Sequence, residues 1–178
     1  MANHETCKSI LHYNDLFQNI TYPTKPSSTP TPVHKHSKKI NAVNCILIGK
    51  KIKTFNLNAY RAGEEDFLQI TDEDLKGRWS VLFFYPADFT FVCPTELEDL
   101  ADNYEEFLKL GVEVYSVSTD SHWTHKAWHE KSDAVSKVKF TMVSDDQFKL
   151  SKQFKVLRKN EGRSDRATFV IDPNCQVQ

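Results

Sequence analysis

The sequence predicts an α/β domain with an at least partly parallel central sheet, preceded by an extension that has no core of its own. From Gly49 onward, short apolar or alternating runs typical of strands exchange with segments whose apolar residues recur at helical spacing. Before that point, residues 23–39 hold four prolines and almost no large apolar side chain. Such a segment cannot bury enough surface to order itself. We therefore expect a largely disordered extension at 1–45 and a folded domain at 46–178.

The extension carries few features that predict structure or chemistry. A short helix is expected over residues 10–20, where apolar residues recur at helical spacing. His34 and His36 could bind a metal, but two histidines in a Lys-rich linker are more typical of a solvated segment. Cys7 and Cys45 have no recognisable chemical setting.

The first elements of the domain surround a buried strand. Residues 54–60 and 66–71 alternate as two short strands, with a turn at 62–65 between them. Thr71 followed by Asp74 is a helix-start signature, and Gly77 can end that short turn. Residues 79–85, WSVLFFY, form a continuous apolar run typical of a strand buried on both faces.

The second half alternates helices with strands. One helix is expected over 97–108, where apolar residues mark a single face, with its end at Leu110-Gly111. Later helices are predicted over 122–130, capped by Thr119, Asp120 or Ser121, and over 147–157. The strands are expected at 112–118, 138–144 and 166–172.

The composition favours a soluble cytoplasmic protein. The 178 residues hold 23 basic and 24 acidic side chains, a formal net charge of −1, so no global field points to nucleic acid or membrane lipid. No apolar run approaches the roughly 20 residues that span a bilayer. The first ten residues lack the features of a secretory signal. Organelle import is less favoured because the first arginine is Arg61, whereas transit peptides are rich in Arg.

The cysteines do not form a disulfide or metal framework. The four, Cys7, Cys45, Cys93 and Cys175, are far apart and include no CxxC pair. Reactive or merely buried thiols remain as the options.

Cys93 lies where the buried strand at 79–85 feeds a helix, which is where α/β sheets gather reactive residues. A free thiol has a pKa of about 8.5, but the first turn of a helix favours the thiolate through unpaired N–H groups and the helix dipole. Pro94 suits that turn. Thr90 would place a hydroxyl over the same turn if the backbone is already winding there, and Pro86 rigidifies the strand exit. The alternative for a lone cysteine is a buried, inert thiol.

Peroxide reduction by a thiolate requires a hydroxyl and a cation beside the sulfur, preferably the planar fork of an arginine. Arg166, which opens the strand at 166–172, is the best-placed candidate, and Arg158 is the second. The alternative for an arginine at a strand start is a salt bridge at the rim, with Asp165 or Asp172 as partner.

The string FFYPADFTFVCPTE resembles the active-site signature of peroxiredoxins, Pro-x-x-x-Thr-x-x-Cys. The surrounding blocks, at 76–129 and 161–173, are similar to the typical two-cysteine branch and above all to bacterial alkyl hydroperoxide reductase C. The resemblance runs from about residue 48 to the last residue. It implies a thioredoxin-like fold, a central mixed sheet flanked by helices, and reduction of hydrogen peroxide and alkyl hydroperoxides without metal, haem or flavin.

The resemblance also implies roles for individual residues. Cys93 matches the peroxidatic cysteine, which becomes a sulfenic acid, and Thr90 the hydroxyl that orients the peroxide. Pro86 matches the residue that packs over the site, and Arg166 the arginine near sulfur and peroxide. Two further residues match supporting positions: Glu96, an acid of the active-site network, and Trp128, an aromatic that as a Trp on a helix could equally be simple core.

Two departures from the family are expected to matter. The last strand, the following helix and the C-terminal arm with its resolving cysteine are absent before Gln178, so we expect a C-terminally truncated domain. Cys175 stands where the family usually carries Gly in a turn, and it is not expected to be the resolving cysteine. The extension at 1–45 is not covered by the resemblance.

The leading hypothesis is therefore a peroxiredoxin that serves antioxidant defence. The resemblance implies thioredoxin or a flavoprotein disulfide reductase as reductant, and a homodimer or higher oligomer in a full-length relative. One alternative is an inactive or chaperone-like partner of full-length peroxiredoxins, since missing elements would expose apolar surface. A disulfide exchanger is a weaker alternative, because it requires a CxxC motif and Cys93-Pro94-Thr95-Glu96 supplies none.

Overall fold

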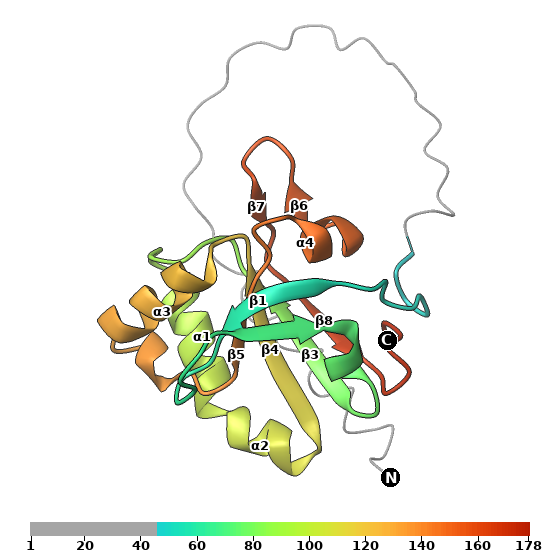
Figure 1. Ribbon diagram of the computed structural model, residues 1–178, viewed down its shortest axis with the longest axis horizontal. Helices are drawn as coiled ribbons and strands as arrows, with labels where there is room; N and C mark the ends of the chain where they lie inside the picture. Colours follow the sequence, from blue (N-terminus) through green and yellow to red (C-terminus); the bar gives the residue numbers. More distant parts are fainter. Residues whose placement is uncertain (1–45) are drawn as a thin grey trace, which may run out of the picture. The chain divides into compact units, whose positions relative to one another are not determined.

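A computed structural model of the protein describes residues 46–178 (Figure 1). The predicted extension at 1–45 lies outside the described residues. So do the predicted helix over 10–20, Cys7, Cys45, His34 and His36.

The framework is a six-stranded mixed sheet with the strand order β2-β1-β5-β4-β3-β8. Its central strands β3, β4 and β5 are parallel, whereas β8 joins β3, β1 joins β5 and β2 joins β1 in antiparallel fashion. The bounds are β1 Asn56–Tyr60, β2 Leu68–Thr71, β3 Trp79–Phe84, β4 Val112–Ser118, β5 Thr141–Ser144 and β8 Ala167–Ile171. Because β3, β4 and β5 run the same way, their carboxyl ends meet at one edge of the sheet.

Helices connect the parallel strands, and a small hairpin precedes β8 (Figure 1). The helices are α1 Cys93–Asp102, α2 Tyr104–Lys109, α3 His122–Lys131 and α4 Lys149–Gln153, with 3-10 turns η3 Asp72–Leu75 and η4 Val135–Lys137. The hairpin pairs β6 Leu157–Arg158 with β7 Arg163–Ser164. No helix among these residues is both long and apolar enough to cross a membrane.

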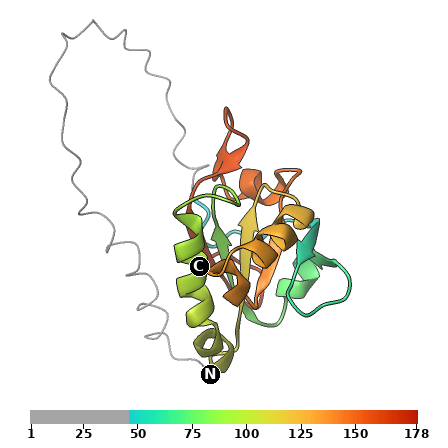
Figure 2. The same ribbon diagram turned by 90° about the vertical axis from the view of Figure 1, so that its left-hand side faces the viewer.

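Alternation along the strands produces two hydrophobic cores, one on each face of the sheet. On β3, Val81 belongs to the core under α1 and α3, whereas Leu82 and Phe84 belong to the core under α4. On β5, Met142 and Val143 divide in the same way. Figure 2 views the molecule from the side of α1 and α3. The sheet therefore separates the surroundings of Cys93 from those of α4.

Most of the predicted elements are confirmed. The mixed sheet flanked by helices is present, all six predicted strands exist, and WSVLFFY forms β3 at the centre. The predicted start signature is a capping box, in which Thr71 and Asp74 bond reciprocally at η3. Ser121 is the residue that caps α3, since its hydroxyl accepts from the N–H of Thr124 at 3.2 Å.

Two helix predictions are wrong in extent. The predicted helix over 97–108 is two helices, α1 and α2, which meet at Asn103. The Asn103 side chain donates to the carbonyl of Asp99 at 2.8 Å, a local bond that competes with helical geometry. The predicted helix over 147–157 is only α4, because Phe148 and Lys155 have φ of 58° and 59° on either side of it. The β6–β7 hairpin that follows was not predicted.

Replacing Phe84 tests the core on the α4 side. Phe84 is fully buried, and its ring lies 5.3 Å from that of Phe154 and 5.8 Å from that of Phe169. We expect Phe84→Ala to lower the free energy of unfolding by about 3 to 5 kcal/mol, through lost burial and a cavity. Urea unfolding measures the change, and Phe91→Ala is the matched control because Phe91 is fully exposed. Equal losses for the two variants would contradict the described core.

Candidate active site

The loop at residues 85–92 carries the chain from β3 to α1. It starts as a continuation of the sheet, since the N–H of Tyr85 donates to the carbonyl of Val117 at 3.1 Å. The chain then reverses at Phe89, whose φ of 54° lies in the left-handed region that is costly for a residue with a Cβ. The Thr90 hydroxyl donates to the carbonyl of Ala87 at 3.0 Å and closes this turn. The loop is thus held in one strained conformation directly before Cys93.

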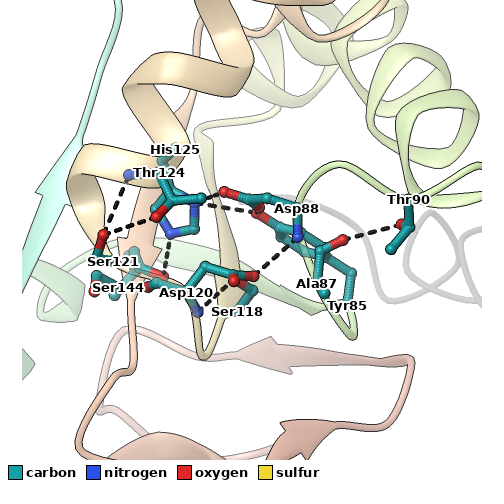
Figure 3. Close-up of polar contacts among 11 residues, drawn as sticks. Tyr85, Ala87, Asp88, Thr90, Ser118, Asp120, Ser121, Thr124, His125 and Ser144 are labelled. Carbon is teal, nitrogen blue, oxygen red and sulfur yellow. Dashed lines mark hydrogen bonds and ion pairs between the residues drawn. The ribbon is translucent and has the colours of Figure 1, made fainter.

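Buried hydrogen bonds among Tyr85, Asp88 and His125 fix the loop against α3 (Figure 3). The Asp88 carboxylate is 2.7 Å from Nδ1 of His125 on α3 and accepts from the Tyr85 hydroxyl at 2.7 Å. Both side chains of the Asp88–His125 pair are essentially inaccessible to solvent. Burial and the nearby Asp88 carboxylate raise the pKa of Tyr85 well above its ordinary value, so Tyr85 remains a donor.

Each ring nitrogen of His125 faces one hydrogen-bond partner. Its Nε2 lies 3.3 Å from the carbonyl oxygen of Val143, which can only accept, so Nε2 carries a proton. Nδ1 of the same ring lies 2.7 Å from Oδ2 of Asp88. The pair is therefore held together by a hydrogen bond in a dry environment, where such bonds are strong.

Asp120 fixes the backbone of the same loop from the end of β4. Its Oδ2 accepts from the N–H of Asp88 at 2.9 Å and from the Ser118 hydroxyl at 3.0 Å. The carbonyl of Asp120 in turn accepts from the Ser144 hydroxyl on β5 at 2.8 Å (Figure 3). The ends of β4 and β5 thus hold the loop that follows β3.

Cys93 is the first residue of α1, as predicted, and its side chain is fully buried. Nη2 of Arg166 lies 3.4 Å from the Cys93 sulfur, and Nε of Arg166 donates to Glu96 at 2.9 Å. Partial burial lowers the pKa of Arg166, but the hydrogen bond and charge of Glu96, with a contribution from Cys93, outweigh it and raise the pKa. The guanidinium is therefore a permanent cation placed against sulfur.

The start of α1 adds to this positive environment. Val92 occupies the N-cap position and provides no side-chain hydrogen bond to the first turn. Pro94 follows Cys93 within the turn, where its missing N–H costs nothing. A negatively charged sulfur at Cys93 is thus stabilised by the helix dipole as well as by Arg166.

The other predicted residues surround this pair. Pro86 is buried at the exit of β3. Trp128 is 2% exposed, belongs to the same buried cluster as Cys93, and lies with its ring 6.0 Å from that of Phe89. Thr90 lies on the loop before the helix begins, so its hydroxyl bonds to Ala87 instead of sitting in one helical turn with Cys93.

The structure distinguishes between the two candidate arginines. Arg158 bonds to Asp165 and Glu161, away from the sulfur. Asp165 is therefore engaged by Arg158, and the partner of Arg166 is Glu96.

Cys175 lies in a different environment from Cys93. It is 1% exposed and belongs to the core on the α4 side, so the sheet lies between the two cysteines. Burial raises the pKa of Cys175 despite the nearby charges of Lys76 and Lys51. Its φ is 61°, a conformation that Gly adopts more readily. These features favour a structural thiol and disfavour a bond to Cys93 within one chain.

Sequence reasoning missed the buried pair of Asp88 and His125. A signal was present, because Asp88 lies between Pro86 and Thr90, and His125 precedes Trp128 by three residues on a helix. That spacing places His125 and Trp128 on one face. Among residues 46–178, no group of three or more His, Cys, Asp and Glu side chains could hold a metal ion.

Comparisons with known proteins match most of the described residues. Residues 48–178 match the model of the AhpC/TSA family. The chain is 57% identical over 132 residues to alkyl hydroperoxide reductase C of Salmonella typhimurium, across 74% of this chain and 70% of the relative.

Solved structures are similar over the same region. A crystal structure of Enterococcus faecalis AhpC superposes with a TM-score of 0.72 at 43% identity, covering 74% of this chain and 78% of the other. The reduced 2-Cys peroxiredoxin of Plasmodium vivax gives a TM-score of 0.69 at 34% identity, covering 75% of this chain and 83% of the other.

Removing His125 tests whether the buried pair holds the loop. We expect His125→Ala to lower the free energy of unfolding by about 3 kcal/mol, because Asp88 is left buried without its main partner. His129→Ala is the control, since His129 is only half-buried and bonds to Tyr60 and Val138 at 3.3 and 3.1 Å. Chemical unfolding of both variants is the measurement. A loss for His125→Ala no larger than that for His129→Ala would refute this role.

Proposed function

The chain belongs to the AhpC/TSA family, and we propose that it is a thiol-dependent peroxidase. Its nucleophile is Cys93, and its substrates are hydrogen peroxide and alkyl hydroperoxides. Its fold is thioredoxin-like, with the mixed sheet and flanking helices of the peroxiredoxins it resembles. The observation that carries the proposal is the contact between Arg166 and the sulfur of Cys93, made at the first residue of a helix.

The reaction is a two-electron transfer from sulfur to peroxide. The Cys93 thiolate attacks the terminal oxygen of the hydroperoxide in line with the O–O bond. An S–O bond forms while the O–O bond breaks, and its electron pair leaves on the departing oxygen. That oxygen takes up a proton and leaves as an alcohol, or as water when the substrate is hydrogen peroxide. Sulfur is left as a sulfenic acid.

We assign Arg166 to stabilising charge at both ends of this transfer. Its Nη2 already faces the sulfur at 3.4 Å, and the remaining N–H groups of its planar fork can donate to a peroxide oxygen. Glu96 accepts from Nε at 2.9 Å and so fixes the plane of the guanidinium. Glu96 is thus a positioning residue that acts through Arg166.

We assign Thr90 to orienting the hydroperoxide. Its O–H already donates to the Ala87 carbonyl, so the lone pairs of its oxygen are the free part of the hydroxyl. They can accept from the O–H of the incoming hydroperoxide, which turns the terminal oxygen toward sulfur.

We assign Pro86 and Trp128 to excluding water from the site. Both are buried, and neither offers a charged group to water near Cys93. Exclusion of water strengthens the interactions of Arg166 with the reacting atoms.

Regeneration requires a second thiol. A thiol that attacks the sulfenic sulfur forms a mixed disulfide and releases water, and a second thiol then frees Cys93. We propose thioredoxin or a flavoprotein disulfide reductase as the physiological reductant, a homodimer or higher oligomer as the assembly, and the cytoplasm as the setting. Relatedness to alkyl hydroperoxide reductase C and 2-Cys peroxiredoxins supports these assignments.

Replacing Cys93 tests the nucleophile. We expect Cys93→Ser to abolish peroxide consumption with dithiothreitol as reductant, because a hydroxyl cannot be oxidised to a sulfenic acid. Dimedone labelling followed by intact mass should give one adduct on Cys93 in the unmodified chain and none in the variant.

Cys175→Ser is the matched control, because Cys175 is an equally buried thiol outside the site. It should retain the dithiothreitol-dependent rate. Loss of that rate in Cys175→Ser would show that Cys175 takes part in the cycle.

Replacing Arg166 tests the cation. We expect Arg166→Gln to slow oxidation of Cys93 by tert-butyl hydroperoxide on the order of 100-fold, the typical effect of removing one donor to developing charge. Arg158→Gln, the same change on the other candidate arginine, should alter this rate little. Rapid-quench single turnovers measure both rate constants. Equal effects of the two changes would show that general charge, and not contact with sulfur, matters.

A further inference from the structure

The β6–β7 hairpin is fastened to the same edge of the sheet as the loop before Cys93. The Ser164 hydroxyl donates to the carbonyl of Tyr85 at 2.7 Å, and the Thr119 hydroxyl donates to the carbonyl of Gly162 at 2.9 Å. Tyr85 and Thr119 follow the ends of β3 and β4 directly. In Figure 1 the hairpin projects from the end of the domain that these strands reach. Its position relative to the site is therefore fixed.

Like charges face each other across this hairpin. Arg158 and Arg163 are direct partners in the pairing register, and Lys159 follows Arg158. Like charges directly opposite on paired strands are destabilising. Both acidic residues of the hairpin region, Glu161 and Asp165, bind Arg158.

The hairpin region carries three basic and two acidic side chains, a net charge of +1, and neither acid bonds to Lys159 or Arg163. Within residues 46–178, neither Lys159 nor Arg163 makes an ion pair or a side-chain hydrogen bond, and both are exposed. These two exposed side chains give the hairpin a positively charged surface, which attracts anions.

Arg163 lies close in the chain to the arginine that contacts the sulfur. It precedes Arg166 by three residues, a stretch that spans at most about 11 Å, and Arg166 contacts the sulfur. Two strongly exposed apolar side chains, Phe91 and Val92, directly precede Cys93. Exposed apolar side chains therefore occur on the segment that leads into Cys93, and exposed cations on the segment that leads into Arg166.

We propose that Lys159 and Arg163 recognise the carboxylate of anionic hydroperoxides, such as hydroperoxides of unesterified fatty acids, and so favour them over neutral ones. This specificity rests on the peroxidase function proposed above. The carboxylate binds the planar fork of Arg163 and the ammonium of Lys159, the alkyl chain lies along Phe91 and Val92, and the peroxide group reaches Cys93. Hydrogen peroxide and neutral alkyl hydroperoxides carry no carboxylate that these two side chains could bind.

The test compares a fatty-acid hydroperoxide with its methyl ester, both below their critical micelle concentrations. The reduced 178-residue chain is oxidised in single turnovers without reductant, and Cys93 sulfenic acid is quantified by rapid quench and mass spectrometry. The acid should react faster than the ester. In the double variant Lys159→Gln with Arg163→Gln, the acid-to-ester rate ratio should fall about three- to tenfold, the sum expected for two exposed charge contacts. Raised salt should lower the ratio in the unmodified chain.

Two variants serve as controls. Lys131→Gln removes one exposed positive charge at the end of α3 and should leave the ratio unchanged. Arg163→Lys keeps the charge, so it should keep most of the ratio.

An unchanged ratio in the double variant overturns the proposal, and so does an equal fall for acid and ester. If the double variant slows only the reduction of the sulfenic acid by an acidic protein reductant, the cations bind that reductant and the substrate proposal is wrong. Oxidation of Cys93 by tert-butyl hydroperoxide distinguishes these failures from failure of the peroxidase function. If that neutral substrate also leaves Cys93 unmodified, both proposals fall.

Discussion

The hydrogen bond between Asp88 and His125 holds the strained loop before Cys93 against α3, and the position of the sulfur depends on it. The loop contains a left-handed Phe89 and leads into a helix without a side-chain cap, so its own backbone does not favour this path. The Asp88–His125 pair holds the loop against α3, and Asp120 holds its backbone from the end of β4. Strain at the site is thus maintained by a rigid group that makes no contact with the reacting atoms.

The parallel strands explain why residues distant in the sequence meet at one place. The carboxyl ends of β3, β4 and β5 lie at one edge, so the loop after β3, the start of α3 and the segment before β8 converge there. Arg166 lies on that last segment, more than seventy residues after Cys93. The register between β3 and β8 determines where along β3 Arg166 lies, and so places it beside the sulfur. A shift of that register by one residue would turn alternate side chains to the other face.

The sequence allowed prediction of features that depend on local pattern. The strand WSVLFFY, the capping box at Thr71 and the helix start at Cys93 follow from alternation, side-chain chemistry and proline geometry. Arg166 was ranked ahead of Arg158, but a salt bridge at the rim stayed open as the alternative, because the partner of an arginine depends on which acids lie nearby in space. The Asp88–His125 pair was missed for the same reason, since each side chain alone is an ordinary surface type. The length of α4 was overestimated, because nothing in its sequence pattern signals the left-handed backbone at Phe148.

The uncapped start of α1 makes the sulfur serve two purposes at once. Since Val92 offers no acceptor to the first turn, a thiolate at Cys93 would be the charge that complements the positive end of the helix. Conversion to a neutral sulfenic acid removes that charge, and with it about 0.3–1 kcal/mol of local stabilisation. In the proposed cycle, the first turn of α1 therefore loses part of its electrostatic stabilisation each time Cys93 is oxidised.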